Sequence, residues 1–426
     1  MKKYIIFTIF FIFLISCSKT KEDNVIKVWH VTASDNQASI KDRAGERFKK
    51  ENPDYDVEII PMKSDAYKTQ IQIAVGADSA PDIISTWGGG TMIGYVKAGK
   101  ILDLSSYVSG VEGFSNKFMP ASLLQGSYEG KIYAIPIDTT TIAMVFYNRK
   151  LFEENGWSVP KTLTELEALC DKILAKGIKP FALANKTKWP ASMYYMSLVQ
   201  RIGGNQVFYD AANRVNGGSF ENPAFIEAGK KLVEWVDKGY FNDGFNGLDK
   251  ESGQSRVLLY TGKAAMEVIG TFAVQAMRFE NPEFAQNNLD AFVFPEIEGG
   301  KWDPKELVGT LGDTFFCISA NSKNPDMAFK LIEKFVDNQA IKEGIEIGYT
   351  PPFKDVVVED RISKKIVDAV NEAPSVQLWY DQYLPPELAE VHKDTLQAML
   401  GKTMTPEEAC QQLEAKALEL LGPSSK

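Results

Sequence analysis

Residues 81–90 read Pro81-Asp-Ile-Ile-Ser-Thr-Trp-Gly-Gly-Gly90, a short β-branched run that leads into a glycine-rich loop. The run predicts a buried strand. Two similar runs precede it, VIKVW at 25–29 and VEII at 57–60. The segments between the three runs, 36–50 and 67–75, have apolar residues at helical spacing. This β-α-β-α-β order predicts an α/β fold with a parallel sheet.

The loops that follow these strands are candidate parts of a binding site. Ligands of parallel α/β sheets bind beyond the carboxyl ends of the strands. Residues 30–36 and 86–91 occupy that position. The three glycines Gly88–Gly90 are not a phosphate-binding loop, because no Gly-Lys-Ser/Thr follows them.

The remainder of the chain is rich in helices. Further strands are expected at 132–141, 144–148, 291–295 and 315–318. Further helices are expected at 164–174, 193–201, 226–238, 255–259, 325–338 and 406–421. Thr162 or Thr164 can cap the first of these helices, and Gly177 lies beyond its end. No internal repeat and no long linker separates the segments, which indicates that the chain crosses between two lobes more than once.

The N-terminus has the features of an export signal. Lys2 and Lys3 precede the apolar run 4–15, which is too short for a membrane-spanning helix of about 20 residues. Leu14-Ile-Ser-Cys17 resembles a bacterial lipobox. The resemblance implies a signal peptide over 1–16, a lipid on Cys17 and a polar tether over 17–24. The alternative is an ordinary signal in which Cys17 occurs by chance.

Composition limits the partners and the chemistry. Loss of Lys2 and Lys3 with the signal leaves 45 basic against 56 acidic residues, a formal net charge of about −11. No dense basic cluster points to nucleic acid. About 410 mature residues exceed one typical core, so two domains are expected.

Cysteine and histidine are scarce. Cys170, Cys317 and Cys410 form no Cys-x-x-Cys pair, and we interpret all three as buried small hydrophobic residues. His30 and His392 are the only histidines of the sequence, which excludes a three-histidine zinc site. His392 is expected at the surface of a helix. No metal or cofactor is expected.

From Val25 to Leu421 the chain resembles the extracellular solute-binding proteins of carbohydrate ABC transporters. The resemblance rests on segments in a characteristic order, namely 26–30 (IKVWH), 72–84 (QIAVGADSAPDII), 130–138 (GKIYAIPID), 146–149 (FYNR), 160–166 (PKTLTEL), 261–266 (TGKAAM), 270–272 (GTF) and 319–329 (SANSKNPDMAF). It implies a two-lobed periplasmic binding protein fold of type II character, joined by hinge strands.

The resemblance also implies a division of the chain. The N-terminal lobe would comprise 25–137 plus 290–345, and the C-terminal lobe 138–289 plus 346–426. Hinge crossings would lie near Asp138, Asp290 and Gly348. Such a fold closes around its ligand.

A sugar requires aromatic platforms and polar acceptors in a cleft. At positions that match the family, the resemblance implies ligand contacts for Trp189, Asp313, Trp379, Tyr380, Asp381, Trp87, Phe272, Thr271, Asp138, His30 and Lys188. The sequence leaves structural roles open for several of them. Trp189 can instead pack against the start of a helix, Asp313 can be a turn residue, and Asp138 can be a hinge carboxylate that caps Thr140. The segment that precedes Asp313, Gly309-Thr-Leu-Gly312, interrupts the glycine pair usual in the family.

The expected protein is a monomeric, exported, lipid-anchored binder that faces the periplasm or the exterior. It would capture a carbohydrate, with an oligosaccharide favoured over a monosaccharide, and deliver it to the transmembrane subunits of an ABC permease. A secreted carbohydrate-active hydrolase, a binder of a non-sugar solute and a surface adhesin are the alternatives. The sequence has no Gly-x-Ser-x-Gly elbow and no His-Glu-x-x-His motif.

Overall fold

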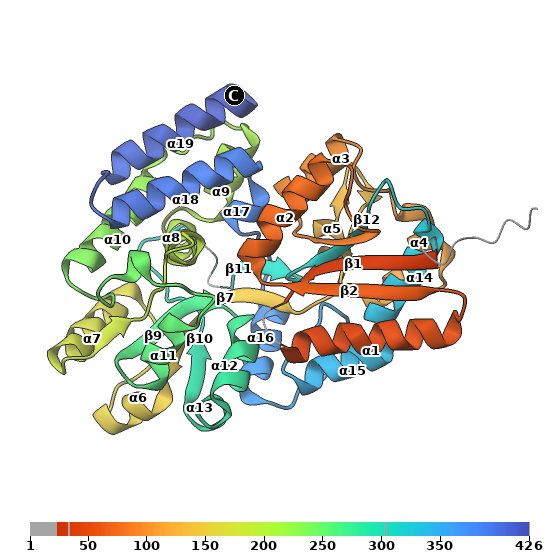
Figure 1. Ribbon diagram of the computed structural model, residues 1–426. Helices are drawn as coiled ribbons and strands as arrows, with labels where there is room; N and C mark the ends of the chain where they lie inside the picture. The colour runs from red at the N-terminus through yellow and green to blue at the C-terminus, as the bar shows by residue number, and fades with distance from the viewer. Residues whose placement is uncertain (1–23, 33–34, 302, 304, 426) are drawn as a thin grey trace, which may run out of the picture.

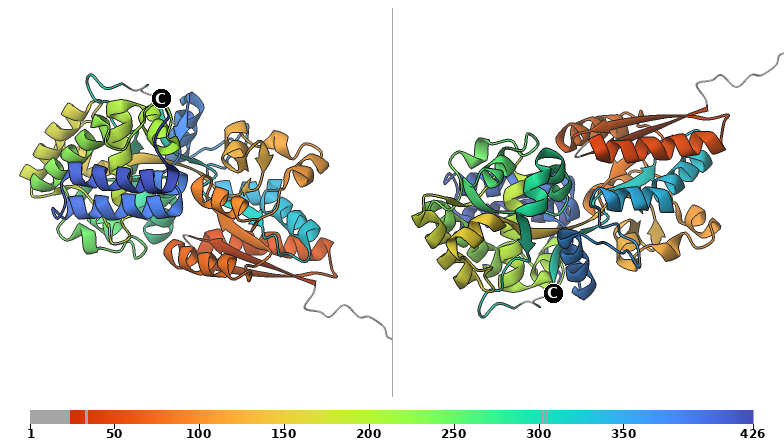
Figure 2. Two further views of the ribbon diagram at one scale, coloured as in Figure 1. Left: turned by 90° about the horizontal axis from the view of Figure 1, so that it is seen from above. Right: turned by 90° about the horizontal axis from the view of Figure 1, so that it is seen from below.

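The protein consists of two α/β lobes that lie side by side (Figures 1 and 2). The structure is a computed structural model that describes residues 24–32, 35–301, 303 and 305–425. The predicted signal, Cys17 and most of the tether lie outside the described residues. Among the described residues, no helix has the length and apolar character needed to cross a membrane.

The first lobe is built on a five-stranded sheet in the order β2-β1-β3-β12-β6. Its strands are β1 (Val25–Val31), β2 (Asp56–Met62), β3 (Ile83–Thr86), β6 (Ile135–Pro136) and β12 (Phe315–Ile318), with the hairpin β4 (Ser127–Tyr128) and β5 (Lys131–Ile132) apart. Its helices are α1 (Asp35–Glu51), α2 (Ser64–Gly76), α3 (Gly90–Lys97), α4 (Ser105–Gly110), η2 (Ser115–Lys117), α5 (Pro120–Gln125), α14 (Pro325–Phe335) and α15 (Asn338–Glu346).

The predicted parallel β-α-β-α-β unit is confirmed. β1 pairs in parallel with β2 and with β3, whereas β12 is antiparallel to β3. Helices cover both faces of this sheet. Phe48 of α1 and Phe329 of α14 pack in one core layer, and Tyr67 of α2 and Met92 of α3 pack in the other.

The second lobe contains the sheet β13-β11-β7-β9-β8, with β10 paired to β7. Its strands are β7 (Thr140–Asn148), β8 (Lys179–Phe181), β9 (Ala264–Gly270), β10 (Leu289–Phe292), β11 (Leu307–Leu311) and β13 (Val376–Gln377). Its helices are α6 (Arg149–Asn155), α7 (Leu163–Ala175), α8 (Trp189–Gly203), α9 (Asn205–Asn213), α10 (Pro223–Asp237), η3 (Phe245–Gly247), α11 (Gln254–Tyr260), α12 (Ala273–Glu280), α13 (Pro282–Asn287), α16 (Arg361–Glu372), α17 (Tyr380–Tyr383), α18 (Pro386–Leu400) and α19 (Pro406–Leu421).

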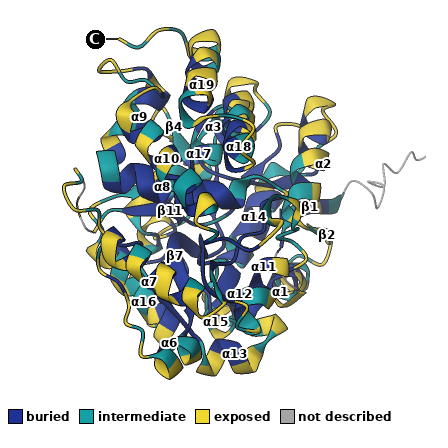
Figure 3. Ribbon diagram, turned by 90° about the vertical axis from the view of Figure 1, so that its left-hand side faces the viewer, coloured by how far each residue is buried: buried dark blue, intermediate teal, exposed yellow. Residues whose placement is uncertain are grey.

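The strands of the second lobe lie inside a shell of helices whose outer faces are exposed (Figure 3). All nine residues of β7 are buried. Capping residues in the sequence fix where several of these helices begin. The Thr162 side chain accepts a hydrogen bond from the Glu165 N–H and caps α7, as predicted. Thr405 and Glu408 form a capping box at the start of α19. The cysteines Cys170, Cys317 and Cys410 are free and buried, which confirms their interpretation.

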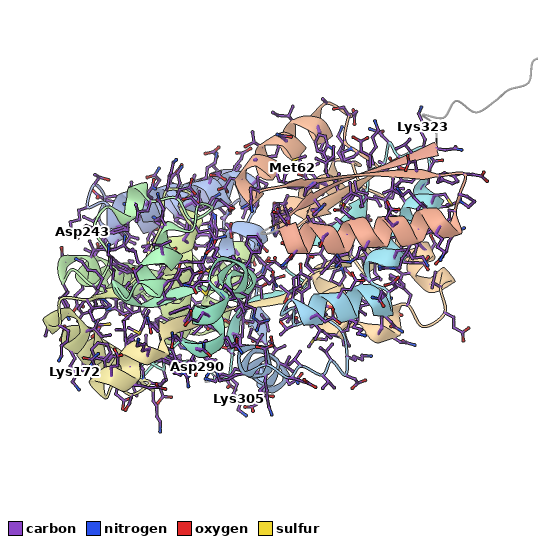
Figure 4. The ribbon with its side chains drawn as sticks, turned by 60° about the horizontal axis from the view of Figure 1, so that its bottom comes forward. Met62, Lys172, Asp243, Asp290, Lys305 and Lys323 are labelled. Atoms are coloured by element: carbon purple, nitrogen blue, oxygen red, sulfur yellow. The ribbon has the colours of Figure 1, made fainter. Side chains whose placement is uncertain are left out.

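The strand pairing corrects the proposed division of the chain. β10 and β11 both pair with β7, so residues 289–292 and 307–311 belong to the second sheet and not to the first lobe. Asp290 is therefore not at a crossing. It lies in β10 (labelled in Figure 4), where its Oδ1 accepts a hydrogen bond from Lys365 Nζ at 2.6 Å. The chain returns to the first lobe only between β11 and β12.

The other labelled side chains of Figure 4 mark the extent of the two lobes. Lys172 and Asp243 lie on the outer side of the second lobe, and Lys323 lies at the far end of the first lobe. Met62 ends β2 on the side that faces the second lobe.

Two further expectations are wrong. His392 is 2% exposed rather than at the surface, because α18 packs against α8 and α19. Its Nε2 lies 2.6 Å from Ser192 Oγ of α8, and burial lowers its pKa to about 4. The helix expected over 325–338 is two helices, since the Asp337 side chain caps a new one, α15.

Candidate functional site

One cleft receives side chains from both lobes. The lining residues from the first lobe, and from the crossing between β11 and β12, are Val31, Thr32, Gln37, Ser64, Lys68, Trp87, Asp313 and Thr314. Those of the second lobe are Trp189, Met193, Lys250, Glu251, Phe272, Gln275, Trp379, Asp381 and Gln382. The rim loop after β3 contributes Trp87, as its place at a strand end predicts.

Four aromatic side chains line this cleft. Trp87 follows β3, Trp189 is the first residue of α8, Phe272 follows β9 and Trp379 precedes α17. The rings of Trp189 and Phe272 meet edge to face, with centroids 5.9 Å apart. Aromatic surface is therefore present on both sides of the cleft.

Two lysine ammonium groups lie against these rings. Lys250 Nζ is 4.9 Å from the centroid of Trp189 and 4.7 Å from that of Phe272. Lys68 Nζ is 5.0 Å from the centroid of Trp87. These distances permit cation–π attraction. Burial lowers the pKa of Lys250, and the nearby carboxylate of Glu251 opposes that change.

Asp313 stands at the crossing from β11 to β12 with a positive φ of 49°. Aspartate tolerates this left-handed conformation better than most residues. Its carboxyl group lines the cleft beside Thr314. Burial, and then the charge of Asp138, raises the pKa of Asp313 to about 7. The group can therefore change its charge near neutral pH.

Further polar groups complete the lining. Asp381 Oδ2 lies 3.9 Å from Lys68 Nζ, so this ion pair joins the two lobes. Two buried polar atoms, Trp189 Nε1 and Gln382 Oε1, have no hydrogen-bond partner among the described residues. An unsatisfied buried polar atom costs about 1–3 kcal/mol, which a bound ligand with hydroxyl groups would recover.

The glycines of the rim loop permit close approach of the lobes. A Cβ on Gly90 would lie 2.1 Å from the Leu384 carbonyl oxygen, and one on Gly89 would lie 2.7 Å from that of Gln382. Gly89 also has φ of +82°. The backbones of the two lobes therefore meet at this side of the cleft.

Six of the residues predicted as ligand contacts meet in the cleft: Trp87, Trp189, Phe272, Asp313, Trp379 and Asp381. Five others, Asp138, His30, Lys188, Thr271 and Tyr380, are not among the lining residues.

Each of these five has another partner. His30 is fully buried in β1, its Nδ1 lies 2.9 Å from the Val31 carbonyl oxygen, and burial lowers its pKa to about 3. Lys188 Nζ pairs with Asp394. Thr271 Oγ1 accepts a hydrogen bond from the Ile142 N–H, and Tyr380 stacks on Phe208 with centroids 3.7 Å apart. The Asp138 carboxylate pairs with Lys41 Nζ at 2.6 Å.

Asp138 is a hinge carboxylate, but the expectation that it caps Thr140 is wrong, because the Thr140 N–H has another acceptor. The chain crosses between the lobes three times, between β6 and β7, between β11 and β12, and between α15 and α16. Asp138 lies in the first crossing. Thr314 of the second crossing donates to its Oδ2, and Tyr349 of the third crossing donates to its Oδ1 at 3.5 Å. Beside it, Thr140 N–H donates to the Thr350 carbonyl oxygen at 2.7 Å. All three crossings therefore meet at one buried carboxylate.

Sequence reasoning missed most of the polar lining, namely Gln37, Ser64, Lys68, Lys250, Glu251, Gln275, Thr314 and Gln382. Gln37 directly follows a predicted rim loop, and that position could have identified it. The others come from helices and loops with no local signal. No group of three His, Cys, Asp or Glu side chains within the described ranges could hold a metal ion.

The family model described as "Bacterial extracellular solute-binding protein" matches residues 33–342. This chain belongs to that family. The solute-binding protein is similar to the multiple sugar-binding protein of Streptococcus mutans, at 25% identity over 81% of this chain and 79% of that relative. It is also similar to the maltotriose-binding protein of Pyrococcus abyssi, at 23% identity over 79% of this chain and 68% of the relative.

Solved structures show the same two-lobed fold. One comes from work on xylan utilization by Caldanaerobius polysaccharolyticus, with 33% identity and a TM-score of 0.83 over 92% of this chain and 99% of that one. Another, a chitin oligosaccharide binding protein, has 24% identity and the same TM-score of 0.83 over 93% and 98% of the two chains.

Proposed function

We propose that this solute-binding protein captures an oligosaccharide in the cleft and delivers it to the permease of an ABC transporter. One observation carries the proposal: aromatic rings and groups that hydrogen-bond hydroxyls line the same cleft from both lobes. Sugar rings offer flat C–H faces to the former and hydroxyls to the latter.

Each group has a role in this proposal. Trp189, Phe272, Trp87 and Trp379 provide stacking surfaces. Asp313 and Asp381 accept hydrogen bonds from sugar hydroxyls, and charge-assisted hydrogen bonds are about twice as strong as neutral ones. Gln382 Oε1 and Trp189 Nε1 supply an acceptor and a donor that have no protein partner among the described residues.

The remaining parts of the proposal concern placement in the cell. Export and lipidation at Cys17 would hold the protein at the membrane surface, where the permease lies. A monomer suffices, since both walls of the cleft come from one chain. The protein would leave the sugar intact, as a carrier and not as a hydrolase.

The relatives guide the choice of ligands to test. The similar structures and sequences concern xylan, chitin oligosaccharides, maltotriose and multiple sugars. Xylo-oligosaccharides come first, because the protein from the xylan work is 33% identical.

The experiment is a thermal-shift screen of the soluble form that begins at Ser18, followed by titration calorimetry and chromatography of the recovered ligand. A ligand that binds only the folded state stabilises it by about 2.7 kcal/mol at one hundred times its Kd. A shift with intact sugar supports the proposal. No shift with any sugar indicates a non-sugar solute, and cleavage of a sugar indicates a hydrolase.

A further inference from the structure

A second hollow adjoins the cleft and is lined from α2 and α3 of the first lobe and from α17 and α18 of the second. These helices lie where the two lobes meet (Figure 1). We call it the side chamber. Lys68, Trp87, Asp381 and Gln382 line both the cleft and the side chamber. The two hollows are therefore neighbours that share one wall.

The shared wall contains no direct hydrogen bond between Lys68 and Asp381. Their closest atoms, Nζ and Oδ2, are 3.9 Å apart, which is longer than a hydrogen bond. Both charged groups therefore retain capacity for hydrogen bonds to hydroxyls of a ligand that lies against them. Gln382 Oε1, which is buried and has no hydrogen-bond partner among the described residues, is a further acceptor in the same wall.

The far walls of the side chamber also suit a sugar. Tyr95 of α3 offers a partly exposed ring. Glu390 and Lys393 of α18 form an ion pair with an Nζ–Oε1 distance of 2.6 Å, and both line the chamber. An aromatic ring opposite charged hydrogen-bonding groups repeats the composition of the cleft at a smaller scale.

We propose that the side chamber is an additional subsite for the end of a linear oligosaccharide that extends past Trp87 and the Lys68–Asp381 pair. This inference rests on the proposed function. It narrows the ligand class to oligosaccharide chains that are too long for the cleft alone. Because both lobes wall the chamber, a long chain contacts both lobes there as well as in the cleft.

The test measures Kd by calorimetry for ladders of one to six units of β-1,4-linked xylose, glucose and N-acetylglucosamine and of α-1,4-linked glucose. Gln72→Trp adds a large side chain to the chamber from an exposed position of α2. Ile73→Trp is the matched control, since Ile73 is the next residue, is 68% exposed and does not line the chamber.

In the wild type, we expect affinity to rise about tenfold between the shortest chain that binds and longer ones, as one or two extra hydrogen bonds would provide. Gln72→Trp should remove this rise and leave the Kd of the shortest chain unchanged, while Ile73→Trp should behave as the wild type. Equal affinity for short and long chains in the wild type would overturn the inference. So would a Gln72→Trp protein that binds long chains as the wild type does. Either result leaves the proposed function intact, whereas failure of every ladder to bind would overturn both.

Discussion

Replacement of Asp138 by Asn tests whether one buried ion pair holds the hinge together. The Lys41 and Asp138 side chains are 5% and 0% exposed, with Nζ and Oδ1 2.6 Å apart. The same carboxylate accepts hydrogen bonds from Thr314 and Tyr349 of the other two crossings. Asparagine has nearly the same shape but lacks the charge.

The expected loss of stability is large. Asp138→Asn leaves the Lys41 ammonium buried without a counter-ion, and breaking a buried pair from one side costs about 3–5 kcal/mol. Most of this loss of stability should come from the buried Lys41 ammonium, because it no longer has a counter-ion. A double variant, Lys41→Met with Asp138→Asn, should therefore recover much of the lost stability.

The matched control is the pair Lys230–Glu407. Its Nζ–Oε1 distance is also 2.6 Å, but its side chains are 59% and 44% exposed. Solvent screens such a pair, so the free energy of unfolding of Glu407→Gln should be close to that of the wild type.

The measurement is urea unfolding followed by circular dichroism, with each variant compared at the same pH. A loss of less than about 1 kcal/mol for Asp138→Asn, the range of a surface pair, would refute the argument. So would a double variant that is less stable than the single one.

Four further predictions concern the cleft and the anchor. Trp189→Ala should weaken sugar binding by about 2 kcal/mol or ~30-fold in calorimetry, because a central aromatic platform is lost; wild-type affinity would exclude Trp189 from the site. Affinity should fall by up to about tenfold per pH unit below pH 7, because Asp313, with a pKa of about 7, must be ionised to accept charge-assisted hydrogen bonds from sugar hydroxyls; Asp313→Asn should flatten the profile, and an unchanged slope would contradict this role. Gly90→Ala should prevent the lobes from meeting, since its Cβ would lie 2.1 Å from the Leu384 oxygen, and should weaken binding about tenfold or more without loss of stability; calorimetry and melting curves separate the two effects. Cys17→Ser should move the protein from the detergent phase to the aqueous phase in Triton X-114 partition, and retention in detergent would argue against lipidation at Cys17.

Local patterns were sufficient for much of the first lobe. The β-branched run that ends at Ile84 and the helical spacing before it predict β3 and α2, because alternation and periodicity act over a few residues. Ligand loops at strand ends follow from the parallel topology, and Trp87 was found in this way.

Pairing between distant strands was harder to predict. Residues 290–292 were expected in the first lobe, but β10 pairs with Phe146 and Tyr147 of β7. The apolar run alone is compatible with either sheet, since a buried strand looks the same wherever it pairs. The position of a crossing therefore depends on the whole sheet.

His392 shows a similar limit. A histidine in a helix is usually at least partly exposed, and nothing near it in the sequence indicates the partner Ser192. Only the packing of α18 on α8 buries it.

The sequence by itself determined the α/β class, the parallel start of the first sheet, the resemblance to solute-binding proteins and several of the cleft aromatics, because strand pattern and family motifs are local in the chain. The tertiary structure alone decided which candidates share the cleft. It places the Lys250 ammonium over the ring of Trp189 and the Lys68 ammonium near the Asp381 carboxylate. It also buries Asp138 and His30 in the interior. The physical reason is that a site between two lobes is formed by side chains from distant parts of the chain, and their approach depends on packing that no short segment encodes.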